Sequence, residues 1–387
     1  MRKLASVGLV VVAVIAAAGA AYFINERLKI VPWQTADAQQ AGLNKHKLAT
    51  LRDELERHRT RAFLLVKDGN LVFEWYASGF GETTAFYTAS LAKSIVGGIA
   101  LLKAVSDGAL SLSDPISKFY PPWRSDPKKS KITIYHVATH TSGMEDACPA
   151  QEAQCAEWKL KYWPHRHRLA GFTIALNDAT ITFAPGTQFI YSNPAFSNVL
   201  AYAITASLQS TNVGDIRSLL YTDIAKPLHI PSSVWRISGG RTIKLDNYDL
   251  ISIGGGCNIS ARAAAKLGQL MLNSGKWNGQ QIISNTAVEY ATTDKNNLRS
   301  KLIGEARIPV PGVGGWWLNS NDVWPVLPND TYLGAGANHQ IVLIIPSKKI
   351  VAVRFGDRLG RDSWNGDYWQ ALENTLLNPL MDAIDPN

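Results

Sequence analysis

The two ends of this 387-residue chain carry similar strand, turn and strand patterns, and these restrict the fold more than any other feature. In residues 61–76, two apolar runs flank the turn Lys67-Asp68-Gly69-Asn70. In residues 340–355, a Pro-Ser-Lys-Lys turn separates two more apolar runs. Residues 314–319 predict a further strand that precedes this pair. Such distant strands can pair into one antiparallel sheet, so the helical middle of the chain must cover this sheet or form a second lobe.

These patterns predict an α+β fold, or α/β in the broad sense, with helices flanking the sheet and a mostly helical lobe. We assign residues 1–25 to a signal anchor or signal peptide, 26–60 to a linker and first helix, and 61–387 to one domain. The lobe is expected at roughly 107–300, and residues 364–380 predict a closing helix. A composition of 46% hydrophobic and 18% charged residues excludes a disordered chain.

The N-terminal segment indicates export. Arg2 and Lys3 precede the uncharged apolar run 4–24, which is about long enough to cross a bilayer as a helix. Two interpretations stay open, a cleaved signal peptide and an uncleaved anchor whose positive end stays in the cytoplasm. Both place the body in the cell envelope, either anchored in the inner membrane with a periplasmic or extracellular body, or secreted.

The charge and the cysteines bear on partners and compartment. The formal net charge is +8, but its lysines and arginines are scattered, so we expect no nucleic-acid partner. Cys148 and Cys155 lie close together in a polar segment and can form a disulfide in an oxidising compartment, which leaves Cys257 over. Because the spacing typical of metal ligands is missing, we expect no metal and no other cofactor.

Ser90 and Lys93 stand three residues apart at the start of residues 90–105, "SLAKSIVGGIALLKAV". A helix this apolar belongs inside a protein, and residues i and i+3 share one of its faces. Burial and the positive end of the helix dipole both disfavour a protonated Lys93. A neutral lysine amine can accept the Ser90 hydroxyl proton, so the two residues are a candidate nucleophile and base.

A structural interpretation of this pair competes with the catalytic one. Ser90 can be a helix N-cap and Lys93 a lysine whose ammonium reaches solvent. Ser-x-x-Lys also occurs at Ser125 and Lys128, where Pro127 and neighbouring charges indicate an exposed loop.

Tyr191 and Asn193 form a second candidate group in "FAPGTQFIYSNPAF". Asn193 before Pro194 is typical of a helix N-cap, whether or not it also belongs to a site. A tyrosine at the end of the short strand expected over residues 188–191 can point its phenol into a cleft and relay a proton.

Five segments in order carry a family resemblance. They are "TASLAKSIVGG" (88–98), "DPISKFYPPW" (114–123), "ITIYHVATHTSG" (132–143), "FAPGTQFIYSNPAFSNVLAYAI" (183–204) and "GGGCNISARAAAKLGQLMLNSGKWNGQQIIS" (254–284). Together they resemble the serine hydrolases of the class C β-lactamase, DD-peptidase and esterase superfamily, and within it the 6-aminohexanoate-dimer hydrolases. Ser-x-x-Lys is an established signature of the related penicillin-recognising enzymes.

The resemblance implies a β-lactamase/DD-peptidase-like fold and a set of roles. Ser90 matches the nucleophile, Lys93 the general base and Tyr191 the proton relay, while Asn193 matches the third position of the family's Tyr-x-Asn motif. The oxyanion hole of such enzymes combines the nucleophile's N–H with one from the strand at the site's far edge. That strand begins here near "GAGANHQIVLIIP".

The same edge departs from the β-lactamase pattern, because no Lys-Thr-Gly motif precedes the strand. His339 and Gln340 are candidate substrate or oxyanion residues there, although a histidine at a strand edge can also be merely polar surface. Trp316 is a further candidate for the cleft, and since neighbouring strand residues face opposite ways, at most one of Trp316 and Trp317 lines it. His140 suggests a Ser-His triad, but its "THTSG" segment resembles a structural loop of the family.

These observations predict an exported serine hydrolase that cleaves a small ester or amide through an acyl-enzyme on Ser90. The alternatives are a penicillin-binding or sensor-like module that acylates but turns over slowly, a β-lactamase or DD-peptidase, and a scaffold with a vestigial site. The expected partners are the small-molecule substrate and, through the N-terminal segment, a membrane. The sequence does not indicate an oligomeric state.

Overall fold

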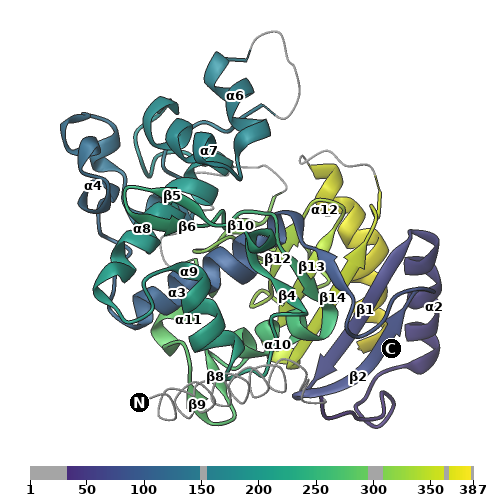
Figure 1. Ribbon diagram of the computed structural model, residues 1–387. Coiled ribbons are helices and arrows are strands. Elements are labelled where there is room, and N and C mark those ends of the chain that lie inside the picture. Colours follow the sequence, from purple (N-terminus) through teal and green to yellow (C-terminus); the bar gives the residue numbers. More distant parts are fainter. Residues whose placement is uncertain (1–32, 149–154, 295–307, 361–365, 385–387) are drawn as a thin grey trace, which may run out of the picture.

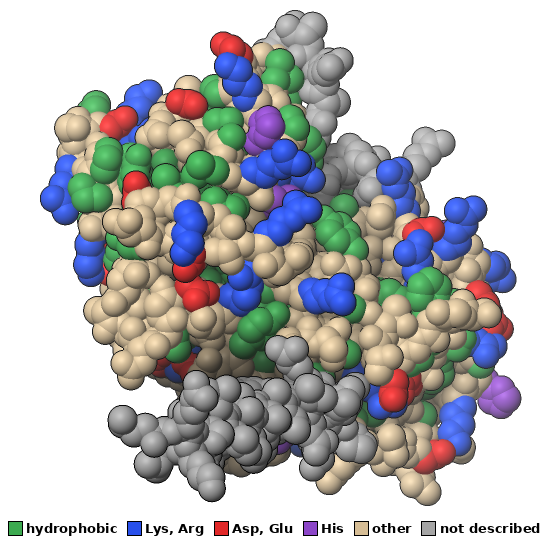
Figure 2. Space-filling model, in the orientation of Figure 1, with side chains coloured by type: hydrophobic (Ala, Val, Ile, Leu, Met, Phe, Trp, Pro, Cys, Tyr) green, Lys and Arg blue, Asp and Glu red, His purple; other side chains and the backbone are tan. Residues whose placement is uncertain are grey.

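The computed structural model describes residues 33–148, 155–294, 308–360 and 366–384 (Figure 1). The apolar segment 4–24, which predicts export, lies outside these residues. On the face drawn in Figure 2, the Lys and Arg side chains are spread among acidic and uncharged groups.

A seven-stranded antiparallel sheet joins the two ends of the chain (Figure 1). In order across the sheet, the strands are β10 (Val310–Pro311), β11 (Trp316–Leu318), β12 (Tyr332–Gly336), β13 (Gln340–Ile345), β14 (Ile350–Gly356), β1 (Thr60–Lys67) and β2 (Asn70–Tyr76). β1 pairs with β14 and places Leu64 opposite Val353. The predicted sheet of N- and C-terminal strands is therefore confirmed.

Both faces of this sheet are buried, which explains the nearly continuous apolar runs of its strands. Along β1, Leu64 and Val66 belong to one hydrophobic core, while Phe63 and Leu65 belong to the other. Successive strand side chains point to opposite faces, so one strand supplies both cores.

Helices cover the two faces (Figure 1). On one face α10 (Ala261–Leu272) packs against β1, β13 and β14. The other face is covered by α2 (Lys45–Arg57), α12 (Gly366–Leu372), η12 (Glu373–Leu377) and α13 (Asn378–Ile384). The closing helix predicted near the C-terminus is thus a run of three helical segments.

Between β2 and β10 the chain leaves the sheet and forms a mostly helical lobe (Figure 1). Its described helical segments include α4 (Ile116–Phe119), η3 (Pro121–Ser125), η4 (Lys129–Lys131), α5 (Ile134–Ala138), α6 (Glu157–His165), α7 (Leu169–Thr173), η5 (Ile174–Asp178), η6 (Pro194–Leu200), α8 (Ala201–Ser207), η7 (Leu208–Ser210), α9 (Ile216–Leu219), η8 (Leu220–Ala225) and α11 (Asn285–Thr292). Short strands also occur here: β3 (Ala85–Tyr87), β4 (Trp235–Arg236), β5 (Ile243–Leu245), β6 (Tyr248–Leu250), β7 (Asn258–Ser260), β8 (Lys276–Trp277) and β9 (Gln280–Gln281).

The apolar helix that starts at Ser90 begins irregularly. A 3₁₀ turn, η1 (Ala89–Leu91), leads into a wide π-helical segment, η2 (Lys93–Gly98), before the regular helix α3 (Ile99–Ser106). Within the described part of the chain, residues 89–106 are the one helix long and apolar enough to span a membrane, but 72% of that stretch is buried. This stretch is therefore a core helix. π-Helical turns such as η2 are frequent at functional sites.

Candidate active site

Ser90 lies at the turn where β3 passes into the core helix. The preceding residue, Ala89, has a positive φ of 47°, which is uncommon for a residue with a side chain. Thr88 donates from its backbone N–H to the Cys257 carbonyl at 3.0 Å and so fastens the turn to the strand β7 region. The half-buried Ser90 side chain is thereby held at the start of the helix.

Lys93 is 2% exposed, and its amine has three polar neighbours. Its Nζ lies 2.8 Å from Asn193 Oδ1, 3.3 Å from the Gly254 carbonyl oxygen and 3.3 Å from Ser90 Oγ. Two of these neighbours, the amide oxygen and the carbonyl oxygen, can only accept hydrogen bonds. Ser90 Oγ alone among the three can also donate.

Burial lowers the pKa of Lys93 to about 7. The nearby carboxylate of Asp146 opposes this shift, and the Arg166 guanidinium adds to it. A substantial fraction of Lys93 is therefore neutral at physiological pH, which is unusual for a lysine.

Tyr191 closes the site from the lobe side. Its ring stacks on His140 with centroids 4.5 Å apart, and its centroid lies 4.8 Å from Lys93 Nζ. Burial raises the pKa of the Tyr191 phenol, while a hydrogen bond with the Ser90 side chain partly offsets the rise. The phenol is therefore protonated at neutral pH.

Asn193 does not cap the helix that it starts, because its side chain makes no capping hydrogen bond to η6. The amide oxygen faces Lys93, and the amide nitrogen donates to the Asp146 carboxylate. The strand predicted just before it, over residues 188–191, is not formed, although the Ile190 N–H donates to the His140 carbonyl at 2.9 Å.

Asp146 is the residue near the site that the sequence analysis missed. Its Oδ1 accepts the Asn193 backbone N–H at 2.7 Å. It follows the "THTSG" segment by three residues, but no spacing rule connects it with Asn193, which lies 47 positions further on. Only the folded structure brings the two together.

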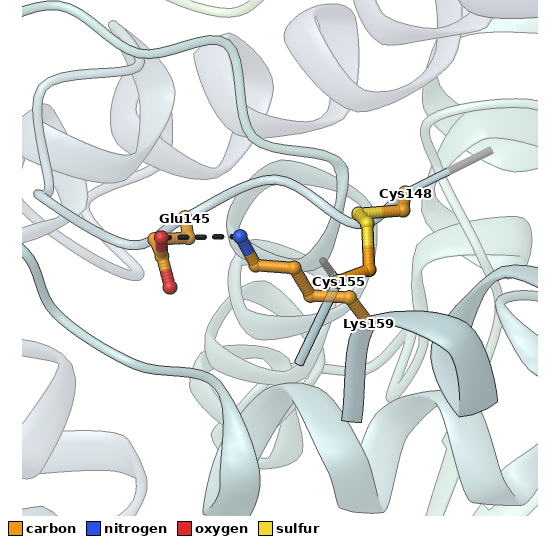
Figure 3. Close-up of a disulfide and its surroundings, with 4 residues drawn as sticks. All are labelled: Glu145, Cys148, Cys155 and Lys159. Atoms are coloured by element: carbon orange, nitrogen blue, oxygen red, sulfur yellow. Dashed lines mark hydrogen bonds and ion pairs between the residues drawn. A yellow bond between two sulfur atoms is a disulfide. The ribbon is translucent and has the colours of Figure 1, made fainter. Parts of the chain in front are cut away.

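Contacts of the residues on either side of Asp146 hold its loop in place. Cys148 and Cys155 are joined by a disulfide, and Glu145 forms an ion pair with Lys159 at 3.1 Å (Figure 3). The Ser192 hydroxyl donates to the Glu145 carbonyl at 3.2 Å. These contacts connect the loop to the segment that carries Tyr191 and Asn193.

His140 has a structural position. Its Nδ1 accepts the Ser192 backbone N–H at 3.1 Å, and its ring stacks between Tyr191 and Phe196. Burial holds the pKa of His140 well below its usual value, so the ring is neutral. The His140 ring packs against the Tyr191 ring and supports it. This agrees with the expectation that the "THTSG" segment is a structural loop.

The side chains of His339 and Gln340 are engaged with groups other than Ser90, contrary to our expectation. The two nitrogens of His339 contact the Tyr368 carbonyl at 3.0 Å and the Leu359 N–H at 3.3 Å. The Gln340 side-chain NH2 group donates to the Gly356 carbonyl at 2.7 Å, and its amide oxygen accepts the Gly356 N–H at 3.1 Å. Both side chains therefore have structural partners, His339 near Tyr368 and Gln340 on the β14 backbone.

Trp316 is likewise not at the site. It is fully buried and its ring packs edge-on against Tyr332. The next residue, Trp317, points to the opposite face, where its ring stacks on Tyr191 at 6.3 Å and contacts Phe189. Trp316, our candidate, is therefore wrong, and Trp317 is the member of the pair that approaches the site, within the expectation of at most one.

The end of β12 comes very close to the Ser90 backbone. A Cβ on Gly336 would lie 2.3 Å from the Thr88 carbonyl oxygen and 3.1 Å from the Ser90 nitrogen. Real Cβ atoms do not approach a backbone oxygen so closely, so this position requires glycine. The backbone of β12 thus runs beside the Ser90 N–H, as expected for the far edge of the site.

The fold together with a buried lysine against a serine defines a serine hydrolase. The chain belongs to the Beta-lactamase family, whose pattern it matches over residues 49–374.

The chain is also similar to individual proteins and solved structures. The chain is 21% identical to the 6-aminohexanoate-dimer hydrolase of Paenarthrobacter ureafaciens over 88% of this chain and 82% of that protein. It is 35% identical to the D-alanyl-D-alanine-carboxypeptidase/endopeptidase AmpH of Escherichia coli K12, but over only 27% of this chain and 26% of that protein. The crystal structure of a penicillin-binding protein homolog from Caulobacter crescentus superposes with a TM-score of 0.62 at 13% identity, covering 87% and 98% of the two chains. That likeness shows the fold alone.

Proposed function

We propose that this protein hydrolyses a small ester or amide through an acyl-enzyme on Ser90, with Lys93 as base and Tyr191 as proton relay. The observation that carries the proposal is the set of neighbours around the Lys93 amine. A neutral amine has two N–H donors and one lone pair. Since Asn193 Oδ1 and the Gly254 carbonyl accept the two donors, the lone pair is left facing Ser90 Oγ at 3.3 Å.

The acylation step follows from this arrangement. Lys93 takes the proton of Ser90 as Oγ attacks the substrate carbonyl carbon, and a tetrahedral oxyanion forms. The Tyr191 phenol passes a proton to the departing alcohol or amine and regains one from the Lys93 ammonium. The bond to the leaving group breaks and an ester on Ser90 remains. A water molecule activated by the same groups then hydrolyses this ester and restores the serine.

An oxyanion needs preorganised donors near Ser90. The Ser90 backbone N–H is one candidate, and the closeness of Gly336 to the same backbone makes the end of β12 the candidate for the second. This pairing agrees with what the family resemblance implies for the far edge of the site.

The rate of acylation should follow the neutral form of Lys93. We expect the second-order rate constant of fluorophosphonate labelling to rise with pH, with its midpoint at a pKa of about 7. Below that pH the ammonium has no lone pair to accept the Ser90 proton, so labelling slows as pH falls. Labelling rates measured from about pH 5 to 9 check this, and a rate that does not change through neutrality contradicts the role of Lys93.

The β12–β13 turn does not offer a cation to an anionic substrate. Its residues are Ala337, Asn338 and His339, and both nitrogens of His339 are engaged with backbone groups. Burial lowers the pKa of His339 to about 4, so its ring is neutral at pH 7. The buried Arg354 guanidinium donates to the carbonyls of Asn338 and His339 behind the turn and has no exposed surface.

Neutral short-chain esters or amides should therefore be hydrolysed faster than benzylpenicillin or a D-Ala-D-Ala peptide. A panel of chromogenic esters and amides, with the penicillin and the peptide beside them, measures kcat/KM for each. Faster turnover of the penicillin than of every ester contradicts the proposal and favours a β-lactamase. Durable labelling by a fluorescent penicillin without any turnover favours a penicillin-binding or sensor-like module.

We further propose that the protein acts outside the cytoplasm, in the cell envelope or after secretion. The disulfide between Cys148 and Cys155 supports this proposal, because disulfides persist in oxidising compartments. The apolar segment that follows Arg2 and Lys3 supplies a means of export.

A further inference from the structure

The carboxylate of Asp146 lies directly behind Asn193 and is surrounded by donors. Its Oδ1 accepts the Asn193 backbone N–H at 2.7 Å, and both oxygens lie 3.2 Å from Asn193 Nδ2. The Ala147 backbone N–H is a further donor. An ionised carboxylate only accepts hydrogen bonds, so these contacts fit the charged form. Burial raises the pKa of Asp146, and the same donors oppose the rise.

This carboxylate decides which way the Asn193 side chain points. A side-chain amide presents an oxygen on one side and an NH2 group on the other, and the two orientations have almost the same shape. With Asp146 on one side, only the NH2 group makes a favourable contact there. The oxygen must then face Lys93, where it lies 2.8 Å from Nζ.

The orientation of Asn193 in turn decides what the Lys93 amine can do. If the amide were reversed, its NH2 group would face Nζ and compete for the lone pair that Ser90 needs. With the oxygen toward Nζ, one N–H of the neutral amine is engaged and the lone pair stays with Ser90.

We propose that Asp146 is a positioning residue of this site, which acts through Asn193 by holding its amide oxygen toward the Lys93 amine. The inference rests on the proposed function, because it assigns to Asp146 the support of the base. Asp146 does not touch Ser90 in this arrangement and is not itself the base.

The charge of Asp146 has a second effect on the same amine. Besides Asp146, the charged or titratable groups that interact with Lys93 include Arg166 and His167 just after α6, His140 after α5, and Tyr191 before η6. Burial keeps both histidines neutral, since it lowers the pKa of His167 to about 4 and that of His140 well below its usual value. Asp146 is therefore the anion among them that favours the Lys93 ammonium, and it keeps the titration of Lys93 near neutral pH.

Asp146→Asn tests the proposal because it removes the charge while nearly preserving the shape. With the charge lost, the pH midpoint of fluorophosphonate labelling should fall by about one unit. With the orientation of Asn193 no longer fixed, the plateau rate at high pH should fall about 10- to 100-fold. Asp223→Asn is the matched control, because Asp223 on η8 (Leu220–Ala225) is also a partly buried carboxylate whose pKa is raised by burial, but its cationic neighbour is Lys103, so the change should leave both values unchanged.

The exchange Asp146→Asn/Asn193→Asp keeps one carboxylate and one amide but places the carboxylate against Nζ. Its labelling midpoint should lie above that of the wild type, and this test also serves if Asp146→Asn does not fold. An unchanged plateau rate in folded Asp146→Asn, or an unchanged midpoint in the folded exchange variant, with wild-type Ser90 still labelled, overturns the role of Asp146 and leaves the proposed function intact. A wild-type protein that is not labelled at Ser90 overturns both.

Discussion

Replacing Ser90 with alanine should abolish fluorophosphonate labelling and reduce ester hydrolysis by about 10³-fold or more, to the background rate. Ser90 Oγ is the hydroxyl that lies 3.3 Å from the Lys93 amine, and it supplies the oxygen that becomes acylated. Labelling of the purified variant and its rate of ester hydrolysis measure the effect, with circular dichroism to show that the variant is folded.

The second Ser-x-x-Lys copy provides the control for Ser90→Ala. The Ser125 hydroxyl donates to the Pro122 carbonyl, and Lys128 Nζ donates to the Ile181 carbonyl, so the two side chains have separate partners. Ser125→Ala should therefore leave the rate close to that of the wild type. If folded Ser90→Ala keeps wild-type turnover, Ser90 is only a residue of the helix start.

Removing the base and the relay together should cost little more than removing the base alone. Lys93→Ala should lower the labelling rate by about 10³-fold or more, and Tyr191→Phe should lower it while keeping the stacked ring. Groups that act as one unit give losses that do not add. The rate of the double variant Lys93→Ala/Tyr191→Phe should thus lie close to that of Lys93→Ala.

Lys266 offers a matched control for the loss of a buried lysine. Its ammonium donates to the Leu228 and His229 carbonyls, and burial lowers its pKa to about 8, but it lies on α10. Lys266→Ala should lower the melting temperature without changing the labelling rate of the folded protein. Fully additive losses in the double variant, on a logarithmic scale, show instead that Lys93 and Tyr191 act independently.

The sequence predicts the sheet and the main site residues because both have local signals. The strands are continuous apolar runs with clear turns, and both faces of the sheet are buried. Ser90 and Lys93 share a helix face by their spacing alone, and the structure brings Tyr191 and Asn193 to them. The 3₁₀ and π-helical start of the helix has no such signal, because it depends on the packing of the turn at Ala89.

The sequence could not decide which side chains of the far strand face Ser90. The period of two in a strand shows that Trp316 and Trp317 face opposite ways, but not which one faces the site. At the β12–β13 turn, Asn338 and His339 both have positive φ, 63° and 55°, and the turn directs the His339 side chain toward Tyr368. Asp146 lacks any local signal, since its partner Asn193 is distant in sequence.

Peptide mapping by mass spectrometry, after wild-type protein reacts with a fluorophosphonate, tests the central claim most directly. The reagent loses fluoride and leaves a phosphonyl group on the oxygen that attacks it. The proposed mechanism predicts one adduct per molecule, on Ser90, formed faster at pH 8 than at pH 6 because Lys93 is then mostly neutral. An adduct on another serine, or none at all in folded protein, contradicts the assignment of Ser90 as the nucleophile.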